Sequence, residues 1–162
     1  MKGKTMCKLS WTLNLILLLI VAGMTYTFIF AGTTVPASDG RQALVLEPGE
    51  RDLVLAEMRA FLESVQAITE GVGARDMAGI AQAARRVGAE ARQAVPGSLI
   101  GKLPLAFKRL GLDTHKRFDT LALDTEQLGD PAHSLQQLSQ LMRNCIACHS
   151  TYRIDTVSTA ED

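Results

Sequence analysis

The sequence predicts an all-α protein: an up-down-up-down four-helix bundle with an N-terminal transmembrane or signal helix. From residue 50 onward, apolar residues recur at every third or fourth position, and breaks containing Gly, Pro or Asp divide this region into four helical segments. Amphipathic helices of similar length joined by short loops are typical of such bundles. No stretch alternates apolar and polar residues regularly enough to predict a sheet.

Composition divides the chain into four parts. Residues 1–31 form a membrane anchor or signal segment, and residues 32–49, rich in Gly, Pro, Thr and Ser, form a linker. Residues 50–155 contain the helical bundle, and residues 156–162 form a tail. Within the linker, the run 43–46 is apolar enough to pack against another part of the chain, but the sequence does not indicate which part.

The N-terminal segment predicts export. It contains a mostly apolar stretch from Trp11 to Ala31, which as a helix would span about 31 Å, close to the hydrocarbon thickness of a bilayer. Three lysines precede this stretch, so the positive-inside rule keeps that flank in the cytoplasm and carries the chain from about Asp39 onward across the membrane. A signal peptide cleaved after Ala37 is the alternative, although its apolar region usually has only about 7 to 15 residues. The sequence therefore favours an uncleaved anchor.

The first two predicted bundle helices follow the linker. One begins near Glu50 and ends before Gly71, with an apolar face formed by Val54, Met58, Leu62, Val65 and Ile68. The other runs from Asp76 to Val95, where a Pro-Gly pair stops it. Its many alanines favour close packing against a neighbouring helix.

A short helical turn over residues 102–111 leads into the other two helices. The third predicted helix spans Asp113 to Gly129, with an inner face formed by Phe118, Leu121, Ala122 and Leu128. The fourth begins at Asp130 and Pro131, a helix N-cap followed by proline at the first helical position. Its apolar residues continue at helical spacing as far as a cysteine pair.

The fourth predicted helix ends in a C-x-x-C-H motif formed by Cys145, Cys148 and His149. Residues i, i+3 and i+4 share one face of a helix, so both thiols and the imidazole point to the same object. This spacing is that of c-type haem attachment, in which each thiol bonds a vinyl group of the porphyrin and the histidine binds the iron as its proximal ligand. The sequence therefore predicts covalently bound haem c.

Two other kinds of site use such a cysteine pair. A dithiol redox centre needs a thiolate of low pKa, whereas the negative end of the helix dipole raises the pKa of a thiol near a helix C-terminus. A structural zinc site usually needs four Cys or His ligands. The remaining cysteine, Cys7, precedes the membrane segment and so lies in another compartment. Both kinds of site remain alternatives to haem.

Residues 145–153 read CIACHSTYR, which resembles the C-x-x-C-H-x-x-Y-R motif that ends the four-helix bundle of class II c-type cytochromes, the cytochrome c-prime family. The resemblance implies that Cys145 and Cys148 hold the haem, that His149 is the fifth iron ligand and that Arg153 lies near the proximal face. Arg153 would equally complement the dipole at the helix end. The N-terminal anchor departs from the usual soluble periplasmic members of the family.

These features predict a membrane-anchored electron carrier and not an enzyme, because the chain has no obvious acid–base pair for handling a substrate. A gas-binding or gas-sensing haem protein with an open distal site is the alternative, and the family resemblance allows both. The expected partners are redox proteins and the inner membrane, with a homodimer also open. The expected location is the bacterial inner membrane facing the periplasm, or the soluble periplasm if the segment is cleaved.

The charge balance gives no indication of nucleic-acid binding. Without its three N-terminal lysines the chain has 14 basic and 17 acidic residues. A protein that binds nucleic acid through its phosphates needs a clear excess of basic residues on one surface. Nucleic acid is therefore not an expected partner.

Met58 is the predicted sixth iron ligand. In an up-down-up-down bundle the start of the first helix lies beside the end of the fourth. Met58 would stand about 12 Å above that start, and His149 about 7 Å above that end, so the two side chains could flank one haem. Some low-spin family members resemble this arrangement by using a methionine on their first helix. Met58 also falls on the apolar stripe, where methionine is a common core residue, and His115 is the alternative donor or a contact for a haem propionate.

Overall fold

The computed structural model describes residues 2–26, 30, 32–89 and 95–156, with side chains from residue 10 onward. Over these residues the chain is mostly helical, as predicted, and also contains a small three-stranded sheet, so the prediction of a chain without a sheet is wrong. The helices are α1 (Lys2–Thr25), α2 (Pro48–Ala74), α3 (Met77–Arg85), α4 (Gly97–Lys102), α5 (Leu105–Leu128) and α6 (Pro131–Thr151). The strands are β1 (Val35–Pro36), β2 (Gln42–Leu46) and β3 (Tyr152–Thr156).

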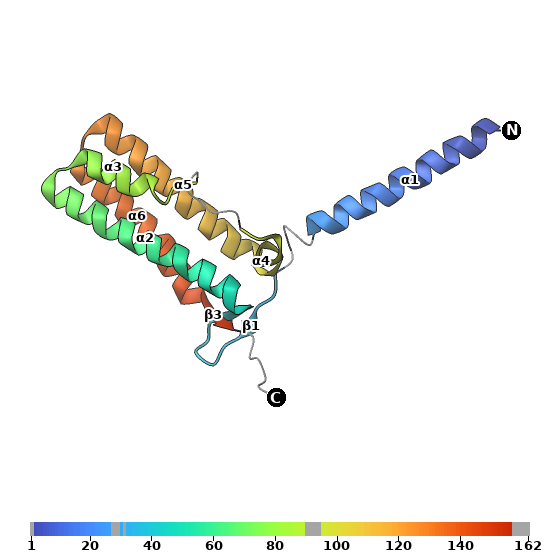
Figure 1. Ribbon diagram of the computed structural model, residues 1–162, viewed down its shortest axis with the longest axis horizontal. Helices are drawn as coiled ribbons and strands as arrows, with labels where there is room; N and C mark the ends of the chain where they lie inside the picture. Colours follow the sequence, from blue (N-terminus) through green and yellow to red (C-terminus); the bar gives the residue numbers. More distant parts are fainter. Residues whose placement is uncertain (1, 27–29, 31, 90–94, 157–162) are drawn as a thin grey trace.

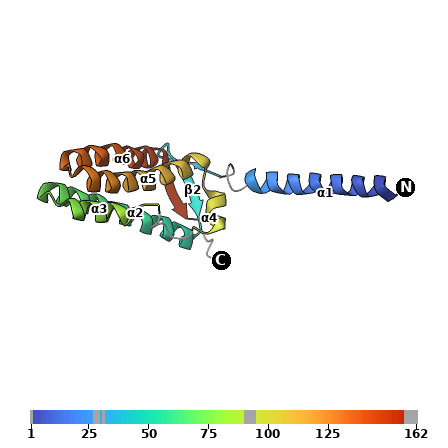
Figure 2. The same cartoon turned by 90° about the horizontal axis from the view of Figure 1, so that it is seen from above.

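Helix α1 projects away from the remaining helices (Figures 1 and 2). Its large apolar side chains are exposed, among them Trp11, Leu17 and Met24. In the part of the chain whose side chains are described, no helix combines the length and the apolar character needed to cross a membrane.

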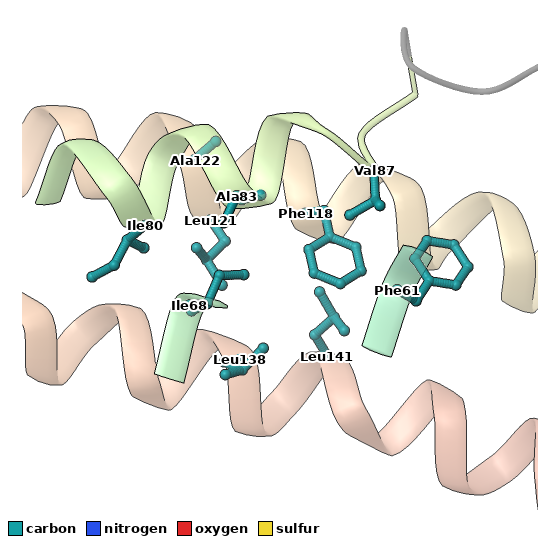
Figure 3. Packing of buried hydrophobic residues seen from close by; sticks show 11 residues of the cluster. Phe61, Ile68, Ile80, Ala83, Val87, Phe118, Leu121, Ala122, Leu138 and Leu141 are labelled. Atoms are coloured by element: carbon teal, nitrogen blue, oxygen red, sulfur yellow. The ribbon is translucent and has the colours of Figure 1, made fainter. Parts of the chain in front are cut away.

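Helices α2, α3, α5 and α6 pack against one another, with α2 and α3 in one layer and α5 and α6 in the other (Figure 2). Their inward faces form the helix-core cluster, most of whose members come from the predicted apolar stripes and which includes Phe61, Ile68, Ile80, Phe118, Leu121, Leu138 and Leu141 (Figure 3). Leu62 and Leu128 were predicted to face inward, and both predictions are wrong, because these side chains are 69% and 59% exposed. The rings of Phe61 and Phe118 stack with their centroids 5.5 Å apart. Complete burial of each large apolar side chain contributes about 1.5–3 kcal/mol, so this cluster is the main source of stability.

Several helix boundaries differ from the predicted ones. Helix α2 continues past Gly71 to Ala74, and α4 was not predicted. Helix α5 starts at Leu105, directly after Pro104, so the predicted short turn and third helix are one continuous helix. Helix α3 ends at Arg85 and not near Val95, although residues 90–94 of the predicted helix lie outside the described part of the chain. After α3 the backbone tightens into i→i−3 bonds, and the amide of Ala89 donates to the carboxylate of Asp119 at 2.9 Å, which draws the chain onto α5.

The sheet joins the segment before α2 to the segment after α6. Its strand order is β1-β2-β3, with β1 and β2 antiparallel and β2 and β3 parallel, and Gln42 is paired with Tyr152 at the start of the parallel register. Leu44 and Leu46 are completely buried in a second group, the sheet-end cluster, with Val54, Leu99, Leu103 and Phe107. The apolar run assigned to a linker is therefore a buried strand whose partner lies more than a hundred residues further along the chain.

The start of α2 is fixed directly behind β2. Pro48 occupies the first turn, and Glu47 and Glu50 form a capping box in which the Glu47 amide donates to the Glu50 carboxylate at 3.1 Å. Lys102, at the end of α4, donates to the same carboxylate at 2.6 Å. These contacts hold the first turn of α2 against the end of α4.

Candidate haem-attachment site

The C-x-x-C-H motif occupies the last two turns of α6, as the sequence predicts. Cys145 packs against the helix-core cluster, whereas Cys148 packs against the sheet-end cluster. Both thiols are free, and both cysteines are partly buried. The motif therefore lies where the two apolar clusters meet, on the side of α6 that faces α2 and α5.

An apolar cleft of about 440 Å³ opens beside the motif between α2, α5 and α6. Such a volume is within the range of cofactor sites, about 300–1,000 Å³. Cys145, Cys148 and His149 line it together, and the remaining lining is mainly apolar, including Leu55, Met58, Leu62, Val65, Phe107, Leu110 and Met142. The structure thus brings the two thiols and the imidazole to one cavity large enough for a flat organic group.

A second cleft of about 370 Å³ adjoins the first, and we call it the arginine cleft. The two clefts share the residues Leu55, Met58, Phe107, Cys148 and His149, and the arginine cleft adds Arg41, Arg51 and Arg153. His149 therefore stands between an apolar wall and a group of guanidinium groups. A haem needs the same combination, because its macrocycle is apolar and its two propionates are negatively charged.

The cysteine thiols are poor nucleophiles in this environment. Burial raises the pKa of the Cys145 thiol, and burial together with the neighbouring Cys145 raises the pKa of Cys148 to about 11. Both thiols are therefore protonated at neutral pH, whereas a dithiol redox centre depends on a thiolate. A zinc site would need four ligands, and among the described residues no group of three or more His, Cys, Asp and Glu side chains is placed to hold a metal ion.

The two candidates for the sixth ligand lie in different surroundings. Met58 lines both clefts with His149 and packs against both apolar clusters. His115 lines neither cleft and is 5% exposed, with its Nδ1 atom 2.8 Å from the carbonyl oxygen of Val87 and its Nε2 atom 3.0 Å from Oε1 of Glu57. His115 would have to break one of these bonds to bind iron, whereas Met58 already lines both clefts beside the motif.

Arg153 lies on β3 and lines the arginine cleft with His149. Its Nε atom donates to Asp155 at 2.8 Å, and its Nη1 atom donates to Asp39 at 3.4 Å. These carboxylates raise the pKa of the guanidinium group. Arg153 is therefore part of an ion-pair network as well as a lining residue of the cleft.

Sequence reasoning missed several residues of the site. Arg41 and Arg51 line the arginine cleft, and Phe107 lines both clefts and contacts the ring of Tyr152 edge-on, with centroids 5.4 Å apart. The unexplained apolar run 43–46 was the available signal, because a buried strand brings the residues at its ends to the site. Nothing in the sequence indicated that this strand pairs with the residues after the motif.

Comparisons with known proteins give no family for this chain: a scan of protein-family models, a search of curated proteins and a search of solved structures find no match. The functional assignment therefore depends on the motif and on the surroundings that the fold gives it.

Proposed function

We propose that this protein is an exported c-type haem protein that carries single electrons, with haem bound through Cys145 and Cys148 and with His149 as the proximal iron ligand. One observation carries the proposal: both thiols and the imidazole line the same apolar cleft of about 440 Å³. A bound haem would supply a centre that accepts and releases one electron. Two thioether bonds would prevent its loss.

The chain's own residues would give this centre its surroundings. Leu55, Phe107 and the other apolar side chains of the cleft would exclude water from the macrocycle. The guanidinium groups of Arg41, Arg51 and Arg153 would balance the charge of the propionates at the other cleft. Electron transfer is the proposed use of the site, because a covalently held haem needs only to accept and release one electron.

We further propose that α2, α3, α5 and α6 constitute an up-down-up-down four-helix bundle of the class II c-type cytochrome kind. The packing of α2 on α3, α3 on α5, α5 on α6 and α6 on α2 supports this topology. In such a bundle the start of α2 lies beside the end of α6, which is the arrangement that puts Met58 and His149 on the same clefts. Met58 is accordingly the proposed sixth ligand.

Location at a bacterial inner membrane, with the haem on the periplasmic side, is the accompanying proposal. Its support is the sequence alone: an uncharged, mostly apolar stretch from Trp11 to Ala31 follows three lysines. Membrane fractionation and N-terminal sequencing of the mature protein test it. A mature N-terminus near Ser38, with release by osmotic shock, would make the segment a signal peptide.

A gas-binding haem protein is the second candidate, and the apolar lining on the Met58 side of the cleft favours it. Leu62, Val65 and Phe61 line that side, where a small uncharged ligand would meet few polar groups. This candidate requires that Met58 does not bind the iron. The spin state of the iron in the purified protein distinguishes the two candidates.

Acid–acetone extraction of the matured protein tests covalent attachment. Haem should remain with the wild-type chain, and Cys145→Ser and Cys148→Ser should each lose one thioether bond, which the pyridine haemochrome spectrum reports. Cys7→Ser is the matched control, because Cys7 precedes the segment that enters the membrane. If the extraction removes haem from the wild-type chain, the c-type assignment is wrong.

A further inference from the structure

Helix α6 ends at Thr151, two residues after His149, and its last carbonyl groups lack partners within the helix. The amide of Tyr152 donates to the carbonyl of Cys148. The carbonyl of His149 is reached by a side chain from the other end of the chain: Nη1 of Arg41 donates to it at 3.3 Å and to the carbonyl of Tyr152 at 3.4 Å. A cation at this position also complements the negative end of the helix dipole.

Arg41 is itself held in place by Asp39. Its Nε and Nη2 atoms donate to Oδ2 of Asp39 at 2.9 and 2.7 Å, and its backbone amide donates to Oδ1 at 3.1 Å. The turn between β1 and β2 is tight, with Gly40 at a φ of 83° and its amide bonded to the carbonyl of Ala37. The guanidinium group is therefore presented to the helix end from a fixed hairpin.

The backbone strengthens the same junction. Gln42, which follows Arg41, pairs with Tyr152, and the parallel ladder continues to Leu46 and Thr156. The chain after His149 is thus bound both by β2 and by the arginine that precedes β2. Neither contact involves the imidazole ring, which lines the clefts.

We propose that Arg41, held by Asp39, is a positioning residue for His149: it fixes the main chain at the proximal ligand so that the imidazole meets the iron in one orientation. This inference depends on the proposed haem function. Groups that hold a metal ligand from outside determine its orientation and basicity, and their loss changes the properties of the metal. Arg41 differs from Arg51 and Arg153 in that it bonds the backbone of the ligand itself.

The positive charge of Arg41 could also change the reduction potential of the iron through space. This electrostatic explanation predicts that the Arg41 and Asp39 variants change the potential in opposite directions. If only charge mattered, Arg41→Ala would lower the reduction potential and Asp39→Ala would raise it. If position matters, both variants release the same main chain and disturb the iron in the same way. Arg41→Lys keeps the positive charge. Its single ammonium group cannot replace the Nε and Nη2 donors to Asp39 and at the same time reach the carbonyls of His149 and Tyr152.

Electron paramagnetic resonance of the ferric haem protein tests the proposal, because the g-values report ligand orientation in both high-spin and low-spin iron. Arg41→Ala, Arg41→Lys and Asp39→Ala should each shift and broaden the g-values relative to the wild type. Arg85→Ala is the matched control, since Arg85 holds Glu126 with the same Nε and Nη2 pair, at 3.0 and 2.6 Å, far from the motif. Its spectrum should equal that of the wild type.

Unchanged g-values in the Arg41 and Asp39 variants, or complete rescue by Arg41→Lys, would overturn the positioning role. So would reduction potentials that move in opposite directions for Arg41→Ala and Asp39→Ala with no change in the g-values. Each of these results leaves the haem assignment intact. A wild-type protein without covalent haem would instead disprove the proposed function itself.

Discussion

The two ends of the helical layers are packed differently. At the turn end, where α2 leads into α3 and α5 into α6, Ile68, Ile80 and Leu121 are completely buried. The buried hydroxyls of Thr125 and Ser134 at this end bond each other at 2.8 Å. At the motif end, two clefts open around the cysteines and His149. The same kind of apolar stripe thus produces a closed core at one end and a cavity at the other.

The length of α3 accounts for this difference. Its alanines pack closely between α2 and α5 at the turn end, where Gly71 permits the approach because a Cβ there would lie 2.7 Å from Cγ1 of Ile80. Helix α3 ends at Arg85, and none of its residues lines either cleft. Among the described residues, the helices that line the two clefts at the motif end are α2, α5 and α6, with Arg41 and β3 at the edge. The closed end contains the buried core, and the open end contains the proposed binding site.

The largest expected effect is on the free energy of unfolding, and it tests the difference between the two ends. Phe118→Ala should lower the free energy of unfolding by about 3–5 kcal/mol, because Phe118 is completely buried and its removal leaves a cavity. Leu62→Ala is the matched change at the motif end, and it should alter stability by less than about 0.5 kcal/mol because Leu62 is 69% exposed. Urea denaturation of the haem-free protein measures both. Equal losses in the two variants would contradict the division into a closed and an open end.

The next effect concerns the iron. Met58→Ala should convert a low-spin iron to high-spin and allow carbon monoxide to bind, because it removes the proposed sixth ligand from the clefts. His115→Ala should leave the absorption spectrum unchanged, since both ring nitrogens of His115 are bonded elsewhere. A wild-type iron that is already high-spin would exclude Met58 as a ligand and favour gas binding.

Alkylation of the haem-free protein tests how strongly the motif end protects its thiols. The reaction of iodoacetamide with Cys148 should continue to accelerate up to about pH 11, because burial and Cys145 raise the pKa of this thiol to about 11. A peptide of residues 143–154 is the control, and its rate should level off near the ordinary thiol pKa. A plateau at the same pH in both would show that the fold does not shield Cys148.

The smallest expected effect lies at the edge of the motif end. Arg41 lowers the pKa of Asp39 from 3.8 to about 2 through its side-chain hydrogen bonds. Since the folded pKa is below the unfolded one, this carboxylate stabilises the fold above about pH 4 and ceases to do so as the pH falls through 2. Asp39→Asn should therefore unfold at a slightly lower urea concentration than the wild type at pH 6, with the difference vanishing toward pH 2. An identical difference at both pH values would contradict this ion pair.

Sequence reasoning was most successful where the interactions are local. The periodic apolar residues indicated helices over most of what became α2, α5 and α6, and Asp130 and Pro131 marked the start of α6 correctly. It was less successful at Leu105 and Arg85, because whether a helix continues there depends on contacts with other helices. The capture of the Ala89 amide by Asp119 is one such contact.

The sequence by itself determined the motif, because the spacing of Cys145, Cys148 and His149 on one helix face depends only on helix geometry. It also contained the methionine that shares their clefts. Only the tertiary structure decided that residues 42–46 form a strand beside β3 and that Arg41 bonds the carbonyl of His149, 108 positions further along the chain. Neither the parallel strand pair nor the contact of Arg41 with the end of α6 produces a periodic pattern in the local sequence. Both form only when the packed helices bring these distant segments together.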